Sequence, residues 1–160
     1  FGLVTSHRKE NVDSMQNAKQ ISEALLRLDL PLVYPMHPRT KKMVEKLNIS
    51  LEGIDIIEPV SYKTMISLLS GACLVITDSG GLQKEAYFAK VPCITIRDET
   101  EWIETLENGW NRLVSPNTKD NIIASIIQVL QMNFSNSPYI ENYGTGNASQ
   151  KIIDSILELM

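Results

Sequence analysis

Short apolar runs alternate along the chain with segments in which apolar residues recur every three or four positions. The short runs predict buried strands, and the periodic segments predict helices that cover a sheet. Strands are expected over residues 1–6, 31–36, 54–58, 73–77, 92–96 and 110–114. The run over 73–77 is almost wholly apolar, as is typical of a central strand covered on both faces. This order predicts an α/β domain with a doubly wound parallel sheet.

Helix signals fall between the expected strands. Asp13 is expected to cap the first helix with Gln16 as its capping-box partner, and Ser61 is expected to cap the third. Gly109 would end a short helix over 101–107 with a left-handed residue. Further helices are expected from about 38 to 47, from 80 to 89 and from Asn117 or Thr118 to about 130.

The composition changes after Met132, where residues 133–138 and 143–147 are rich in turn-forming residues. Residues 1–132 are therefore predicted to form one domain, and 133–160 a linker with a final helix. One side of that helix is apolar, so it either packs on its own domain or crosses to a neighbouring one. Because the chain begins inside an expected strand and lacks an initiator Met, it is expected to be a piece of a larger protein.

Composition and charge narrow the class of protein. The chain is 43% apolar and 21% charged, which suits a globular domain. With 15 Lys and Arg against 19 Asp and Glu, the net charge of −4 argues against a broad basic face for nucleic acid. A membrane-spanning run and a secretion signal are both missing, so a cytoplasmic protein without membrane insertion is expected. Cys73 and Cys93 stand in apolar stretches and are predicted to lie in the core.

The most informative candidate site follows the expected central strand. Ser79 can cap the next helix, and glycine in a first turn costs about 1 kcal/mol relative to Ala, so Gly80 and Gly81 need a reason. Free amides there can approach a phosphate closely. Glu85 lies six residues past Ser79, about 9 Å along a helix, where a carboxylate can reach the two hydroxyls of a ribose. The alternative is a tight turn followed by an ordinary solvated Glu.

Three further strand ends carry polar side chains. His7 and Arg8 follow the first strand and could neutralise a diphosphate, although a solvated loop is the simpler interpretation. His37 follows the second strand and is more typical of a structural residue. Arg97 and Glu101 follow the fifth strand, and their role stays open. The two histidines predict no metal site, because no further residues show ligand spacing with them.

Two further acidic residues, Asp98 and Glu99, lie between Arg97 and Glu101 and are interpreted as charges at the start of a helix. Negative charges at the start of a helix interact favourably with the helix dipole. Acid–base machinery is the alternative. We favour the electrostatic role for both.

Together these residues resemble the non-hydrolysing UDP-N-acetylglucosamine 2-epimerases. Residues 5–11 are similar to the family's T-x-H-R-x-E-N, and residues 77–86 to its T-D-S-G-G-x-Q-x-E-A. Residues 97–102 and 109–114 fit later segments of the family. The resemblance implies two Rossmann-like domains in a GT-B type fold with substrate between them. This chain would be the carboxyl-terminal, UDP-binding domain.

The resemblance also implies roles for individual residues. Residues 79–81 would hold the diphosphate, and Glu85 would bind the ribose. Met65 would lie against the uracil, with Pro59 nearby. His37 corresponds to a histidine that contacts a second, regulatory UDP-sugar in some bacterial members. Here Pro38-Arg39-Thr40 follows it, which departs from many members.

The implied reaction interconverts UDP-GlcNAc and UDP-ManNAc for surface polysaccharide precursors. UDP is eliminated across C1 and C2 of the sugar, and the resulting glycal takes UDP back with C2 inverted. No redox cofactor and no essential metal are implied. His7 and Arg8 would stabilise the leaving diphosphate, and Arg97 and Glu101 would contact substrate. The carboxylates for the C2 proton belong to the family's other domain, so this chain alone is expected to bind without turnover.

Other functions stay open. A GT-B type glycosyltransferase would also place a nucleotide diphosphate on a helix amino terminus. A non-catalytic UDP-sugar sensor would share the binding residues without the reaction. Relatives act on other UDP-2-acetamido sugars, including oxidised diacetamido ones. The full-length protein is expected to form a homodimer.

Overall fold

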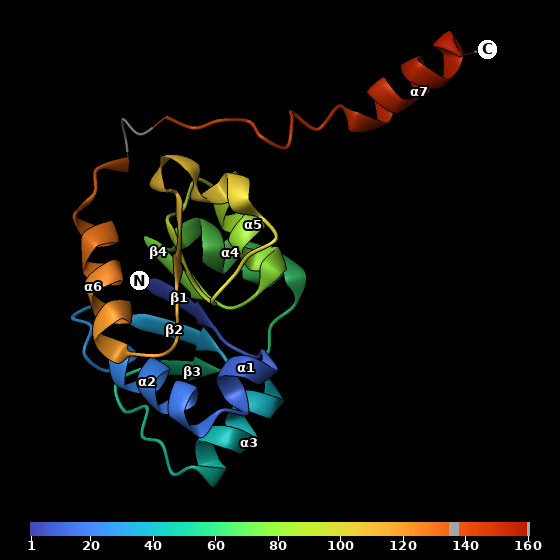
Figure 1. Cartoon of the computed structure of the whole chain (residues 1–160). Coiled ribbons are helices and arrows are strands. Elements are labelled where there is room, and N and C mark those ends of the chain that lie inside the picture. Colours follow the sequence, from blue (N-terminus) through green and yellow to red (C-terminus); the bar gives the residue numbers. More distant parts are fainter. Residues whose placement is uncertain (135–137, 160) are drawn as a thin grey trace.

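The computed structural model describes residues 1–134 and 138–159. Six strands form one parallel sheet in the order β3-β2-β1-β4-β5-β6 (Figure 1). Their bounds are β1 Gly2–Thr5, β2 Leu32–Pro35, β3 Asp55–Ile57, β4 Leu74–Thr77, β5 Cys93–Ile96 and β6 Asn111–Val114. The predicted doubly wound α/β sheet is confirmed, and each expected strand is present near its expected position.

The connecting segments are helical. Their bounds are α1 Lys9–Val12, α2 Met15–Leu25, α3 Pro38–Lys46, α4 Tyr62–Gly71, α5 Gly80–Phe88, the 3-10 helix η1 Ile103–Gly109, α6 Lys119–Gln131 and α7 Ala148–Glu158. Gly109 has φ +76°, so the expected left-handed residue is present. The short helix lies two residues later than expected.

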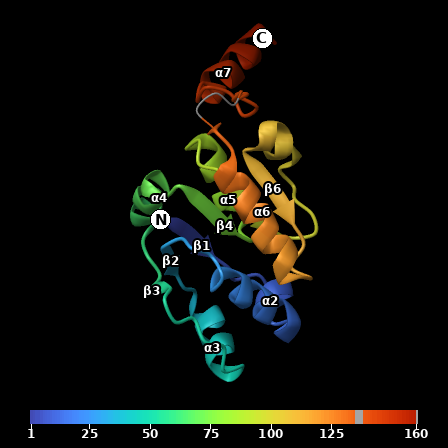
Figure 2. The same cartoon turned by 90° about the vertical axis from the view of Figure 1, so that its left-hand side faces the viewer.

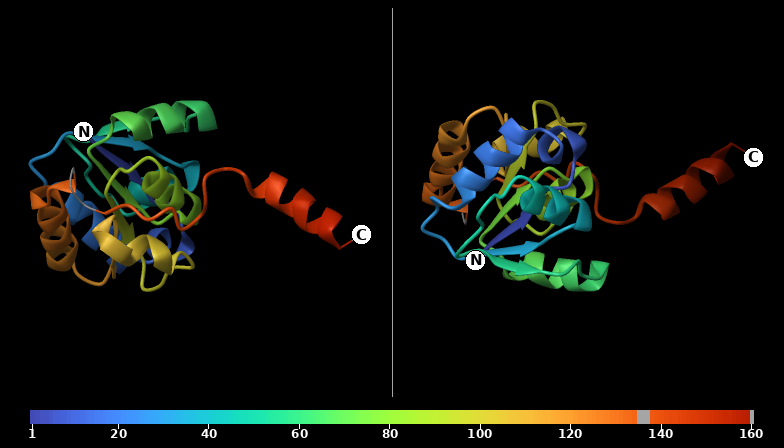
Figure 3. Two further views of the ribbon diagram at one scale, coloured as in Figure 1. Left: turned by 90° about the horizontal axis from the view of Figure 1, so that it is seen from above. Right: turned by 90° about the horizontal axis from the view of Figure 1, so that it is seen from below.

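Two hydrophobic clusters cover the two faces of the sheet. Val4 and Ile76 pack with α2 and α6 on one face. Leu3 and Val75, their neighbours along the strands, pack with α4 and α5 on the other. Seen from above, α4 and α6 accordingly lie on opposite sides of the sheet (Figure 3). Successive side chains of a strand point to opposite faces, which explains why the strands at the centre, which are covered on both sides, are mostly apolar.

Two expectations at the ends of elements were wrong. The side chain of Ser14, not Asp13, caps α2 by accepting a hydrogen bond from the backbone nitrogen of Asn17. Asp13 instead ends the short helix α1 and binds Arg39. Cys93 is buried as expected, whereas Cys73 is exposed. Strand β4 begins only at Leu74, so Cys73 belongs to the turn that precedes it.

The segment after α6 is tethered to the domain. Trp110 Nε1 donates to the carbonyl of Pro138 at 3.0 Å, and the Tyr87 hydroxyl donates to the carbonyl of Ile140 at 2.7 Å. Helix α7 then extends away from the sheet, and its side chains are exposed (Figures 1 and 2). Within this chain, α7 therefore does not pack on the domain. The linker residues 135–137, and Met160 of the expected last helix, lie outside the described residues.

None of the described helices is long and apolar enough to cross a membrane.

Candidate functional site

Strands β1 and β4 lie side by side at the centre of the sheet, where the direction of strand order reverses. From β1 the chain continues outward to β2 and β3, and from β4 it continues the other way to β5 and β6. The carboxyl ends of strands at such a point leave a crevice, where open α/β sheets bind ligands. Thr5 and Thr77 end the two strands, and their hydroxyls lie 2.6 Å apart. The loops after β1 and β4 therefore meet.

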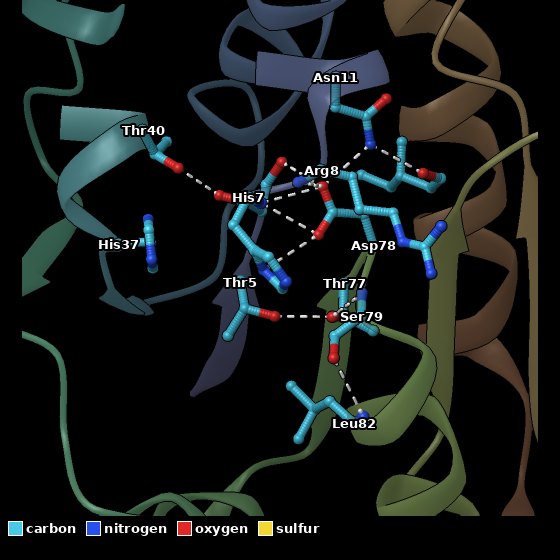
Figure 4. A network of polar contacts seen from close by, with 12 residues as sticks. Thr5, His7, Arg8, Asn11, His37, Thr40, Thr77, Asp78, Ser79 and Leu82 are labelled. Carbon is cyan, nitrogen blue, oxygen red and sulfur yellow. Dashed lines mark hydrogen bonds and ion pairs between the residues drawn. The ribbon is translucent and has the colours of Figure 1, made fainter. Parts of the chain in front are cut away.

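Asp78 organises this crevice, although sequence reasoning gave it no role. Its buried carboxylate accepts hydrogen bonds from the Ser6 hydroxyl at 2.9 Å, from the backbone nitrogens of His7 and Arg8, both at 3.0 Å, and from the Asn11 amide at 3.2 Å (Figure 4). It also lies 3.5 Å from His7 Nδ1. Asp78 thus fixes the path of the loop that carries His7 and Arg8. Its position directly after a central strand was the available signal.

The start of α5 keeps backbone donors free. The Ser79 hydroxyl accepts from the Leu82 nitrogen at 3.4 Å, which satisfies one amide of the first turn. No described residue accepts a hydrogen bond from the nitrogen of Gly80 or Gly81. A Cβ on Gly81 would meet only Ser79 Oγ, at 3.9 Å. These amides are therefore available to an anion, which the helix dipole also favours.

A cavity of about 280 Å³ gathers most of the predicted residues. Its lining includes His7, His37, Pro59, Met65, Ser79, Gly81 and Glu85. They come from the ends of β1 and β2, from α4 and the loop before it, and from the first two turns of α5. Sequence positions almost eighty residues apart thus face one another. Gly80, which was predicted with Gly81, is not part of this lining.

At the far end of the cavity, Glu85 has a neighbour that sequence reasoning missed. The carboxylate of Glu85 raises the pKa of the Tyr62 phenol, first through its negative charge and also through a hydrogen bond. Tyr62 is 70% exposed and is the first residue of α4. Its place next to the capping residue Ser61 carried no chemical signal.

Arg8, Arg97 and Glu101 form a cluster beside the start of α5. Glu101 lies 2.6 Å from Arg97 Nη1 and 3.7 Å from Arg8 Nη2. The pKa of Glu101 is lowered, most strongly by a hydrogen bond from its own backbone amide and further by the two arginines. A second cavity of about 260 Å³ is lined by both arginines, together with Asp98 and Glu99. The open question about Arg97 and Glu101 thus has a structural answer: they pair.

A family model for UDP-N-acetylglucosamine 2-epimerase matches residues 1–157. The chain belongs to this family. It is 41% identical over 162 residues to a UDP-N-acetylglucosamine 2-epimerase homolog of Methanococcus maripaludis, covering 98% of this chain and 44% of the relative. It is also 41% identical to the UDP-2,3-diacetamido-2,3-dideoxy-D-glucuronate 2-epimerase of Pseudomonas aeruginosa, covering 99% of this chain and 45% of that one.

Solved structures agree with the family assignment. The UDP-GlcNAc 2-epimerase of Methanocaldococcus jannaschii in complex with UDP-GlcNAc and UDP superposes with a TM-score of 0.87 at 36% identity, covering 99% of this chain and 45% of that one. A heptosyltransferase of E. coli matches with a TM-score of 0.55 at 14% identity, which reflects the fold alone. The chain thus spans less than half the length of the epimerases that it matches.

His37 has a structural task in this epimerase-family domain. Its Nδ1 accepts a hydrogen bond from the Arg39 nitrogen at 3.1 Å, so His37 caps α3. Its ring lies 6.0 Å from that of His7 and also lines the cavity (Figure 4). Among the described residues, no group of three or more His, Cys, Asp or Glu side chains is arranged to hold a metal ion.

Proposed function

We propose that this chain is the UDP-binding domain of a UDP-N-acetylglucosamine 2-epimerase that interconverts UDP-GlcNAc and UDP-ManNAc. The observation that carries the proposal is the cavity at the ends of β1 and β4. It combines free amides at the start of α5 with Glu85 and with His7, in a chain that belongs to the epimerase family. No other described cavity combines these three features.

The dimensions of the cavity suit a nucleoside diphosphate. In the proposed arrangement the diphosphate lies on the amides of residues 79–81, and Glu85 accepts hydrogen bonds from the two ribose hydroxyls. The six residues that separate Ser79 from Glu85 correspond to about 9 Å along the helix. Beyond the ribose, Met65 and Pro59 supply an apolar surface for the uracil.

The same geometry suits the elimination of UDP. Negative charge grows on the diphosphate as the bond to the sugar breaks, so donors aimed at it stabilise the transition state more than the ground state. The α5 amides, His7 and Arg8 are such donors in this domain. Asp78 accepts hydrogen bonds from the backbone nitrogens of His7 and Arg8. It therefore fixes the positions of these two residues before the negative charge develops on the diphosphate. This arrangement of preformed donors avoids reorganisation during the reaction.

A second candidate substrate has its own support. The relative from Pseudomonas aeruginosa, whose name gives a diacetamido glucuronate as its sugar, is as similar to this chain as the Methanococcus homolog. An oxidised UDP-2-acetamido sugar would carry an additional carboxylate. This carboxylate is a difference between the two candidate sugars, so activity on each of them distinguishes the two substrates.

The reaction is tested on the full-length protein that contains this chain. In D₂O, elimination and re-addition at C2 exchange the C2 hydrogen with solvent. We expect deuterium at C2 of UDP-GlcNAc and a second set of sugar signals in the NMR spectrum. Presenting UDP-2,3-diacetamido-glucuronate in parallel distinguishes the two substrates. Transfer of sugar to an acceptor without exchange at C2 would contradict the proposal and favour a glycosyltransferase.

We also propose that the rest of the protein supplies a second domain and that α7 crosses to it. The support is the exposed apolar side of α7, where Ile152, Ile153, Ile156 and Leu157 are each at least half exposed. An exposed apolar stripe of this kind is normally buried against another part of the protein. In the full-length protein, hydrogen exchange of α7 should be slow, and fast exchange there would contradict the proposal.

A further inference from the structure

Glu101 lies against the first turn of α5, next to the proposed diphosphate site. If Gly80 carried a Cβ, that atom would lie only 2.5 Å from Glu101 Oε1. Substituting Gly80 with any other residue would therefore displace this carboxylate. Because Gly80 has no side chain, the Glu101 carboxylate can lie against the first turn of α5. Gly81, in contrast, lines the cavity.

Hydrogen-bond donors surround this carboxylate. Arg97 binds it closely and Arg8 lies within ion-pair distance. Trp102 Nε1 is buried, has no hydrogen-bond partner among the described residues, and lies 3.7 Å from the same Cβ position on Gly80. A buried donor without a partner calls for an explanation such as an absent ligand. The two guanidinium groups, the Trp102 indole nitrogen and the free amides of α5 together form an anion-binding site. The anion that occupies it in this structure is the Glu101 carboxylate.

A diphosphate bound at the start of α5 would occupy the same anion-binding site as the Glu101 carboxylate. Glu101 is ionised at neutral pH, because its pKa is lowered by its own backbone amide and by the two arginines. A diphosphate on the neighbouring amides would be repelled by the Glu101 carboxylate and would compete with it for Arg8 and Arg97. The Glu101 side chain is 46% exposed, so it can turn toward solvent without disturbing the core.

We propose that Glu101 is an exchangeable counter-ion of the diphosphate site. In the ligand-free chain it neutralises Arg8 and Arg97, and a bound diphosphate displaces it and takes over both guanidinium groups. This inference rests on the proposed function, because it concerns the same diphosphate. Its consequence is that Glu101 weakens the binding of UDP and favours its release.

The test is calorimetric titration of the chain with UDP and with uridine. Glu101→Gln removes the charge but keeps the size of the side chain. Glu45→Gln is the control: it removes the same charge from an exposed side chain of α3 that lines neither the proposed diphosphate cavity nor the cavity beside Arg8 and Arg97. We expect E101Q to bind UDP about fivefold more tightly than the unmodified chain, as removal of one nearby like charge implies. Uridine affinity should stay unchanged, and E45Q should bind UDP like the unmodified chain.

The remaining outcomes are distinct. Equal UDP affinity of the unmodified chain and E101Q would overturn this inference alone. Weaker binding by E101Q would also overturn it and would make Glu101 a positioning residue for Arg8 and Arg97. Failure of every chain to bind UDP would overturn the proposed function and this inference together. Glu101→Ala, with thermal unfolding of each variant, separates the loss of charge from any change in folding.

Discussion

The Asp78 carboxylate lies 3.0 Å from the backbone nitrogen of Arg8, where the two central strands end side by side. One buried side chain directly after β4 thereby determines how the loop after β1 is folded. That loop presents His7 to the cavity and Arg8 to Glu101. The geometry of the proposed site therefore depends on a residue that need not touch the ligand.

Asp78→Asn is expected to destabilise the chain. The variant keeps the shape of the side chain, but an amide NH₂ group then faces donors such as the Arg8 nitrogen, and the negative charge is lost. A cost of about 3 kcal/mol is expected for a buried, multiply hydrogen-bonded carboxylate. Urea unfolding measures it. Asp55→Asn, at an exposed position of β3, should cost little, and equal losses in the two variants would contradict the role of Asp78.

Gly81→Ala should separate binding from stability. A Cβ at this position has space in the ligand-free structure, so the variant should fold and gain about 0.5 kcal/mol from the better helix propensity of alanine. The same methyl group would stand between a phosphate and the free amides, so UDP affinity should fall at least tenfold. Calorimetry and thermal unfolding measure the two effects. Undiminished UDP binding would remove Gly81 from the site.

Glu85→Ala is expected to weaken both UDP and uridine, because both carry the ribose diol. Loss of hydrogen bonds to a charged group corresponds to about tenfold in affinity. The matched control is Glu45→Ala, an exposed helical glutamate on α3 far from the cavity. If calorimetry gives the same affinities for all three chains, Glu85 does not bind the ribose.

The buried thiol of Cys93 is expected to make stability pH-dependent in alkaline solution. Burial raises its pKa to about 12 from an ordinary value near 9. Between these values the unfolded chain loses the proton and the folded chain keeps it, so the free energy of unfolding falls as the pH rises. The slope from this group is about 1.4 kcal/mol per pH unit.

Urea unfolding of Cys93→Ala between pH 9 and 10.5 checks this slope. Removing the thiol should lower stability at neutral pH, because a cavity remains, but should make the alkaline decrease shallower. Cys73→Ala, at an exposed position, is the control and should leave the decrease unchanged. An unaltered slope in Cys93→Ala would contradict the prediction.

Much of the fold follows from local pattern. The strand over Leu74–Thr77 could be placed at the centre because all of its residues except the last are apolar. Helix α1 could not be predicted, because four residues are too few to show a period. Its presence moved the start of the next helix from Asp13 to Ser14. The boundary of β4 was also uncertain by one residue. Because the strand begins at Leu74 and not at Cys73, the Cys73 side chain is exposed and not buried.

Some parts of the proposed site could likewise be predicted from the sequence, and others could not. The positions of His7, Ser79 and Glu85 around one cavity could be predicted from the sequence, because parallel strands end at the same edge of a sheet and a helix has a fixed rise. The contact of Glu101 with Gly80 could not, because it depends on how a side chain from one loop turns toward another element. The pairing of Tyr62 with Glu85 is equally a matter of side-chain direction across two helices.

The tether after α6 fixes the point from which α7 departs. Pro138 and Ile140 are bound to side chains of the domain, and the Asn142 amide donates to the Glu104 carbonyl at 3.2 Å. Gly144 and Gly146, both with positive φ, are the residues that follow. Residues 144–147 therefore connect the tethered part of the chain to α7, and their backbone sets the direction in which α7 leaves the domain.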